Sequence, residues 1–84
     1  MRLPVIKHVV DFIEENDEDW VVESIELLEH LAEAKGMKDE ELEVIGEILS
    51  NLYGSVAVSK EIKNGKSRKE ALNGFMERVV GSIN

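Results

Sequence analysis

The helical spacing of its aliphatic residues is the feature that most constrains the fold of this chain. In the segment 17–35, aliphatic residues recur at steps of four and three residues, at Val21, Ile25, Leu28 and Ala32. This spacing places their side chains on one face of an α-helix, and glutamates fill much of the remaining surface. The valine-rich stretches elsewhere keep helical spacing and have no hairpin turn between them. We therefore predict an all-α fold without strands.

Turn and capping residues divide the chain into four predicted helices. Pro4 suits a first helical turn, because its missing N–H has no helical partner there. Asn16 or Asp17 can cap the second helix and Asp39 the third, while Ser67 and Glu70 form a capping-box pattern. The predicted helices span approximately 4–15, 18–35, 39–63 and 67–82. We expect them to form one domain over residues 1–84, a small antiparallel bundle whose third helix is the longest.

A glycine interrupts the third predicted helix. Glycine inside a helix costs about 1 kcal/mol relative to alanine, so the sequence is consistent with two structures. Either the helix continues to Lys63, straight or bent, or it breaks at Gly54 and a short helix follows. The apolar positions keep their spacing across Gly54, which favours the continuous helix. Gly46 and Gly54 are also places where another helix can approach closely, within the chain or across a dimer.

Charge is segregated along the chain. The net charge is −8, and the stretch from Asp11 to Glu47 holds fifteen acids and two lysines. From Lys60 to Arg78 the sign reverses, with six basic residues and three acids. An acidic chain repels phosphates, so we predict no nucleic-acid binding, despite the basic strip around the turn at 64–65. The strip comprises Lys60, Lys63, Lys66, Arg68 and Lys69.

The same composition bounds the location and the oligomeric state. No apolar run is long enough to span a bilayer, and the first ten residues do not resemble a signal peptide. The absence of cysteine fits a reducing cytoplasm and excludes disulfides and thiolate metal sites. A chain of this length buries only roughly 60–65% of its unfolded surface, and association is a common way to bury more. We therefore predict a cytoplasmic homodimer, with a well-packed monomer as the alternative.

Two histidines raise the question of a metal site. His8, Glu26 and His30 are the candidate ligands, because acids and histidines on facing helices build metal sites in bundle cores. That pattern places a glutamate three residues before the histidine, and Leu27 stands there before His30. We therefore predict no metal and no other cofactor. A bundle that binds a metal or a small ligand is kept as an alternative function.

Catalysis is not expected either. A catalytic acid needs a cleft and an environment that perturbs its pKa. A bundle of this size, with its acids spaced along solvent-facing helix surfaces, offers little cavity. Neither histidine has a recognisable serine or aspartate partner pattern. The sequence therefore predicts a protein that is not an enzyme.

A non-catalytic protein–protein interaction or regulatory module is the remaining prediction. Its surface would be acidic and its partner basic, so reversing the charge of Glu26 and Glu33 should weaken binding without unfolding the protein. Trp20 either covers the core or, like Tyr53, anchors a partner, because these residue types are enriched at interfaces. A structural subunit of a larger assembly is the other alternative. The predicted surface comprises Trp20, Glu23, Glu26, Glu29, Glu33, Glu43, Glu47 and Tyr53.

Overall fold

Four α-helices make up the structure, a computed structural model that describes residues 2–81, with side chains described for residues 2–79. No strand occurs within this part of the chain, so the predicted all-α fold of four packed helices is confirmed. The predicted end of the last helix at residue 82 lies outside the described residues. The helices are α1 (Leu3–Glu15), α2 (Glu18–Ala32), α3 (Asp39–Lys63) and α4 (Arg68–Gly81).

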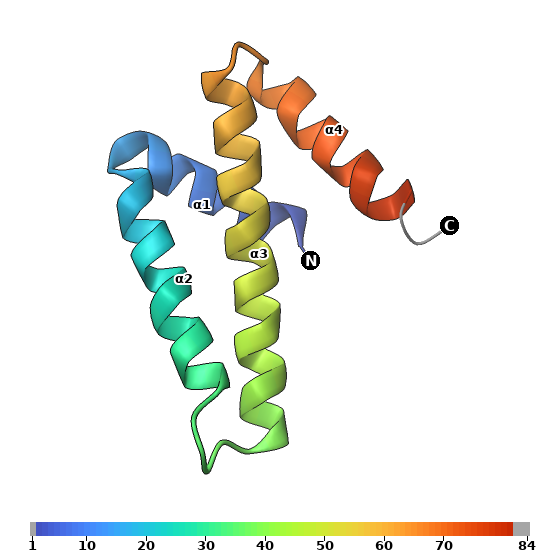
Figure 1. Ribbon diagram of the computed structural model, residues 1–84. Helices are drawn as coiled ribbons and strands as arrows, with labels where there is room; N and C mark the ends of the chain where they lie inside the picture. Colours follow the sequence, from blue (N-terminus) through green and yellow to red (C-terminus); the bar gives the residue numbers. More distant parts are fainter. Residues whose placement is uncertain (1, 82–84) are drawn as a thin grey trace.

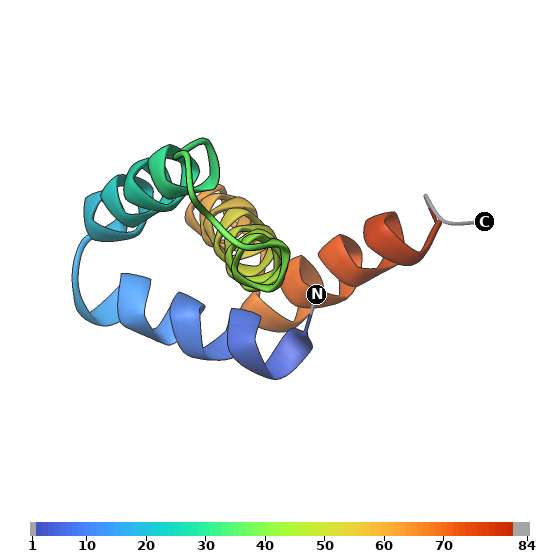
Figure 2. The same ribbon diagram turned by 90° about the horizontal axis from the view of Figure 1, so that it is seen from below.

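The central element is α3, because each of the other helices packs against it. The helix α2 runs antiparallel beside α3, and the two form a helical hairpin (Figure 1). The helix α1 crosses this hairpin on one side only, as the view along α3 shows (Figure 2). The helix α4 starts at the end of α3 and diverges from it. The molecule is consequently flat, with extents of 43 × 35 × 17 Å.

Two predicted caps begin their helices as expected. Asp17 begins α2, because its Oδ1 accepts a hydrogen bond of 3.1 Å from the Asp19 N–H. Ser67 precedes α4, and its Oγ accepts a hydrogen bond of 3.1 Å from the Glu70 N–H. The Ser67 hydroxyl also donates to the Glu70 carboxylate over 3.0 Å. Side-chain acceptors thus satisfy N–H groups that have no partner inside the helix.

The start of α3 differs from the prediction. Lys38, and not Asp39, occupies the N-cap position, and Asp39 is the first helical residue. A lysine side chain has no acceptor and so cannot cap a backbone N–H. Only the reciprocal half of a capping box forms, in which the Lys38 N–H donates to the Glu41 carboxylate over 3.0 Å. The acids of the first turn still lie at the positive end of the helix dipole.

The end of α2 also differs. The helix ends at Ala32, three residues before the predicted boundary at Lys35. The Ala34 N–H donates to the Leu31 carbonyl over 3.1 Å, so the last turn tightens to a three-residue step and leaves the α-helical path. Gly36 takes a left-handed conformation, with φ of 87°, in the loop that follows. Glycine adopts this conformation without the steric cost that a Cβ atom would bring.

Gly54 lies inside a continuous helix, as the unbroken apolar spacing favoured. A Cβ atom at this position would lie 2.8 Å from Phe75 Cζ and 3.4 Å from Ile6 Cδ1. The missing side chain therefore lets α4 and α1 pack closely against α3. At Gly46 an added Cβ would meet no described atom within 4 Å. Within the described chain, only Gly54 of this pair provides a close helix contact.

The core consists of two clusters that share α1. One joins α1, α3 and α4 through the buried residues Ile6, Val10, Val58, Ala71, Leu72 and Phe75. The other joins α1 to α2 through buried Ile13, Val21 and Ile25, against which Leu49 and Leu52 of α3 pack. Both clusters lie along α1. The part of the hairpin that extends beyond α1 contributes little to either.

Candidate functional site

The two aromatic residues predicted to anchor a partner lie on opposite sides of the α2–α3 hairpin. Trp20 lies on the side that carries α1, where its ring is tilted by 60° against the ring of Phe12, with 6.2 Å between centroids. Tyr53 lies on the other side, where its hydroxyl donates a hydrogen bond to the Glu29 carboxylate. The structure therefore divides the predicted interaction surface in two.

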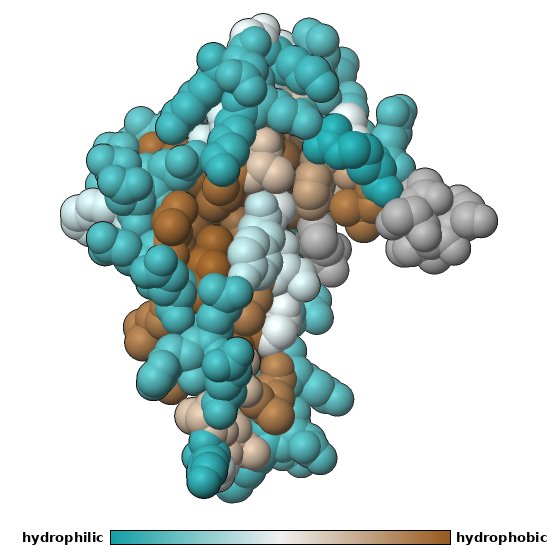
Figure 3. Space-filling model, in the orientation of Figure 1, coloured by the Kyte–Doolittle hydropathy of each residue, from teal (hydrophilic) through white to brown (hydrophobic). Residues whose placement is uncertain are grey.

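A groove of about 460 Å³ runs between α2 and α3 on the side away from α1; we call it the acidic groove. Its floor is apolar and consists of Val22, Ile25, Val56 and Ala57. Its rim is polar and consists of Glu26, Glu29, Tyr53 and Lys60. The space-filling view shows hydrophobic surface between the two helices, with hydrophilic side chains along both edges (Figure 3). The groove thus combines apolar surface with two carboxylates.

The hydrogen bond between Tyr53 and Glu29 crosses the acidic groove from α3 to α2. This hydrogen bond raises the pKa of Tyr53, and partial desolvation and the charge of Glu29 act in the same direction. The phenol of Tyr53 therefore keeps its proton, and with it the role of donor, to a higher pH than an ordinary tyrosine. Its side chain is half exposed, so the ring is held in place and is still available for contact.

The other predicted acids lie outside this pair. Glu33, the C-cap residue of α2, continues the row of Glu26 and Glu29 along the helix surface. The remaining predicted acids do not line the groove, although their side chains are exposed; they are Glu23, Glu43 and Glu47. The structure therefore brings together Glu26, Glu29 and Tyr53, with Glu33 beyond one end.

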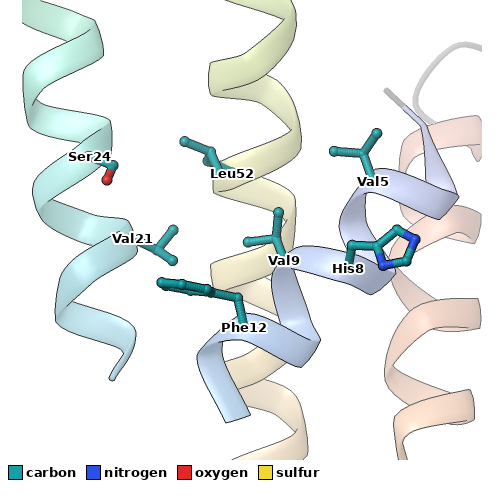
Figure 4. A pocket seen from close by; sticks show the side chains of 7 residues that line it. All are labelled: Val5, His8, Val9, Phe12, Val21, Ser24 and Leu52. Carbon is teal, nitrogen blue, oxygen red and sulfur yellow. The ribbon is translucent and has the colours of Figure 1, made fainter. Parts of the chain in front are cut away.

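A second groove, of about 430 Å³, lies on the side of α1 and was not anticipated from the sequence; we call it the α1-side groove. Apolar side chains from three helices point into it, with His8 at its edge (Figure 4). Its members lie on helices whose packing the sequence did not reveal. The only local signal was the seven-residue spacing of Val5 and Phe12. The lining residues are Val5, His8, Val9, Phe12, Val21, Ser24 and Leu52.

The candidate metal ligands are not brought together. His8 lines the α1-side groove and Glu26 lines the acidic groove, so the hairpin separates them. His30 is exposed in the last turn of α2. Among residues 2–79, no three histidine, cysteine, aspartate or glutamate side chains are placed to hold a metal ion.

Two members of the basic strip join helices of the same molecule, because Lys63 of α3 pairs with α2 and Arg68 of α4 pairs with α1. Arg68 also donates a hydrogen bond of 3.0 Å to the Lys7 carbonyl, which joins the start of α4 to α1. These intramolecular contacts reduce the charge that the strip offers to a phosphate. The ion pairs are Lys63 with Glu18 at 3.8 Å, Lys66 with Glu61 at 3.6 Å, and Arg68 with both Asp11 at 2.7 Å and Glu14 at 3.4 Å.

The fold and the two grooves described above define a small four-helix protein with apolar surface open on both sides of a helical hairpin. The chain belongs to DUF6952, a family of unknown function whose model matches residues 1–84. No curated protein and no solved structure matches the chain. Within the described residues, no helix is both long and apolar enough to cross a bilayer.

Proposed function

We propose that this protein is a non-catalytic protein–protein interaction module whose acidic groove binds a partner segment carrying both apolar and basic side chains. The observation that supports this function is the composition of the groove, in which an apolar floor lies beside Glu26, Glu29 and the tethered ring of Tyr53. An apolar floor favours burial of a partner's aliphatic side chains, by about 25 cal/mol for each Å² removed from water.

The carboxylates determine which partners bind and how quickly. Exposed acids at the rim of an interface mainly raise the association rate for a basic partner and make binding sensitive to salt. Glu33 extends the acidic row beyond the groove, and Asp19 and Glu23 add two more exposed acids on α2. Lys60 is the only base among the residues that line the groove, and it lies toward the end of α3.

Tyr53 suits the role of an anchor. Aromatic side chains supply a large contact area at low entropic cost, and tyrosine is enriched among residues that dominate binding energy. The hydrogen bond to Glu29 fixes the ring before a partner arrives, which lowers the cost of ordering it on binding. Tyr53 shares its row on α3 with Gly46 and Ser50, small residues at helical spacing that let a partner helix approach closely.

The proposed function is tested by capturing partners from the native cell extract at low and at high salt. Bait proteins are the natural chain, Glu26→Lys in the groove and Glu77→Lys on α4. The two variants change the net charge equally, so Glu77→Lys separates a local effect from a general one. We expect the natural chain and Glu77→Lys to retain a basic protein at low salt and to lose it at high salt. Glu26→Lys should not retain it.

Two results would contradict the function. One is retention of the same partner by Glu26→Lys and Glu77→Lys with equal affinity, because the groove would then play no part. The other is recovery of the bait alone at both salt concentrations. Circular dichroism of both variants verifies that exposed charge reversal leaves the helices intact.

A further inference from the structure

The helix α1 covers only one half of the hairpin side on which it lies. Its last buried residue, Ile13, packs with Val21 and Ile25 in the first half of α2. Its other end contacts α3 at Asn51, whose Oδ1 accepts a hydrogen bond of 2.9 Å from the Arg2 N–H. The later turns of α2 and the earlier turns of α3 extend beyond α1, as the lower half of the hairpin in Figure 1 shows.

On this uncovered half, α2 directs apolar side chains to the side that carries α1. Trp20 contacts α1, and Ser24 lines the α1-side groove, so both mark this face of α2. Leu27 and Leu31 follow Trp20 by seven and eleven residues and therefore share its helix face. Their side chains are 61% and 36% exposed, although leucine is among the residues most often buried.

The helix α3 continues the same surface. Asn51 faces α1, and Ile48 and Val44 precede it by three and seven residues, so they lie in the same row. Ile48 also precedes Leu52 of the α1-side groove by one helical turn. The side chains of Ile48 and Val44 are 41% and 58% exposed.

These side chains and two on the edge of α1 form one surface, which we call the open apolar face. It contains six of the nine large apolar side chains that are exposed among the described residues, and Trp20 borders it. Exposed apolar side chains gathered on one side of a protein are typical of an interaction site. The open apolar face consists of Val5, Phe12, Leu27, Leu31, Val44 and Ile48.

The protein exposes more surface than a compact protein of the same mass. The protein exposes 5862 Å², whereas a compact protein of 9.5 kDa exposes about 5050 Å². The excess of about 800 Å² is of the size that each partner loses in an interface of standard size, and the uncovered half of the hairpin and the diverging α4 both contribute to it (Figure 1). The radius of gyration, 13.7 Å, likewise exceeds the value of about 12 Å expected for a compact chain of this length.

The shape of the open apolar face fits a second copy of the same chain. Each copy carries α1 as a second layer over one half of its hairpin and lacks that layer over the other half. A two-fold axis with antiparallel hairpins places the uncovered halves against each other. The α1 helix of each copy then lies beside the hairpin tip of the other, the loop of residues 33–38 between α2 and α3. Such a contact is self-complementary, and the four hairpin helices pack as in a bundle.

Charge favours the same arrangement. Lys35 and Lys38, at the hairpin tip, are the only bases between Asp11 and Glu47. In the antiparallel arrangement, this tip lies near α1 of the other copy, where Glu15 is exposed. These two lysines therefore approach an acid of the other copy, and this attraction offsets part of the repulsion between two chains of net charge −8.

We propose that two copies of this chain associate through the open apolar face. This association uses the opposite side of the hairpin from the acidic groove, so it does not depend on the function proposed above. The test is the molar mass of the purified chain in solution, measured by sedimentation equilibrium. At a concentration of about 100 µM, well above the micromolar end of affinities for such interfaces, we expect twice the chain mass of 9.5 kDa.

Matched variants test which face is used. Leu27→Glu places a charge in the open apolar face and should give the mass of one chain. Val22→Glu places the same charge at a 37% exposed apolar position on the other side of α2 and should leave the mass doubled. Because Leu27 is 61% exposed, its replacement should leave the helical circular dichroism unchanged. Val44→Glu, on α3, repeats the test should Leu27→Glu fail to fold.

Three outcomes would overturn the inference. A natural chain with the mass of one copy at this concentration would show that the face serves another partner or a small ligand. Dissociation by Val22→Glu but not by Leu27→Glu would place the interface on the side of the acidic groove, opposite the open apolar face. Masses above two copies that rise with concentration would exclude a closed two-fold pair.

Discussion

Replacing Gly54 with alanine should weaken the fold, although alanine is the better helix former. The added Cβ would lie 2.8 Å from Phe75 Cζ, a distance at which one of the two groups must move. Phe75 is buried in the cluster that joins α1, α3 and α4, and the added Cβ would also lie 3.4 Å from Ile6 Cδ1 of the same cluster. The ring therefore has little room to withdraw.

Gly46 provides the matched control in the same helix. An alanine there meets no described atom within 4 Å, so only the gain in helix propensity remains. That gain is about 1 kcal/mol at either position. Overpacking a core by one methyl group costs about 1–3 kcal/mol. We therefore expect Gly46→Ala to be about 1 kcal/mol more stable than the natural protein, and Gly54→Ala to fall about 1–3 kcal/mol below Gly46→Ala.

The difference between the two variants is measured by urea unfolding, followed by circular dichroism. Both proteins are studied at one concentration, because association adds a stability that depends on concentration. In thermal unfolding, each kcal/mol corresponds to about 4–8 °C in Tm for a domain of this size. Equal free energies of unfolding for the two variants would refute the reasoning, because the close contact at Gly54 would then cost nothing.

Three further predictions concern single contacts. Asp17→Ala removes the cap of α2 and should lower the free energy of unfolding, measured by urea titration, by about 1 kcal/mol. An unchanged free energy of unfolding would show that the cap does not stabilise the protein. Arg68→Ala should lower the free energy of unfolding by up to about 1 kcal/mol at low salt and by less at high salt. The loss should be larger than that caused by Lys69→Ala. Glu29→Gln should lower the pKa of Tyr53, the only tyrosine, in a titration of phenolate absorbance. Because the natural pKa is raised in the fold, the hydrogen bond stabilises the protein below the unfolded pKa. That contribution disappears as the pH rises through the raised pKa. An unchanged pKa in Glu29→Gln would exclude the carboxylate as the cause.

The sequence allowed the helices to be predicted because their signals are local. Apolar spacing identified α3 through Gly54, and the side chains of Asp17 and Ser67 identified two helix starts. The prediction was less accurate where competing local contacts determine the residue at which a helix begins or ends. At the end of α2, the last turn tightens at Ala34, and the helix ends before the predicted boundary at Lys35.

The surfaces were harder to predict, because they depend on how helices pack. Trp20 and Tyr53 were expected on one surface, and the direction in which α1 crosses the hairpin puts them on opposite sides. The α1-side groove has the same origin, since Phe12, Ser24 and Leu52 meet only after three helices have packed. Spacing within one helix places residues on a face, but it does not say which neighbour covers that face.

The half of the hairpin beyond α1 has a consequence for motion. Between Leu31 and Val44 the described chain has no buried residue, and Ile45 is the first buried position of α3. Segments with few buried contacts open locally at a small fraction of the global unfolding free energy. In a single copy, the amide hydrogens of these turns should therefore exchange with solvent much faster than those beside Gly54. Exchange at the hairpin tip would then slow as the protein is concentrated, so its backbone would report whether the second copy is bound.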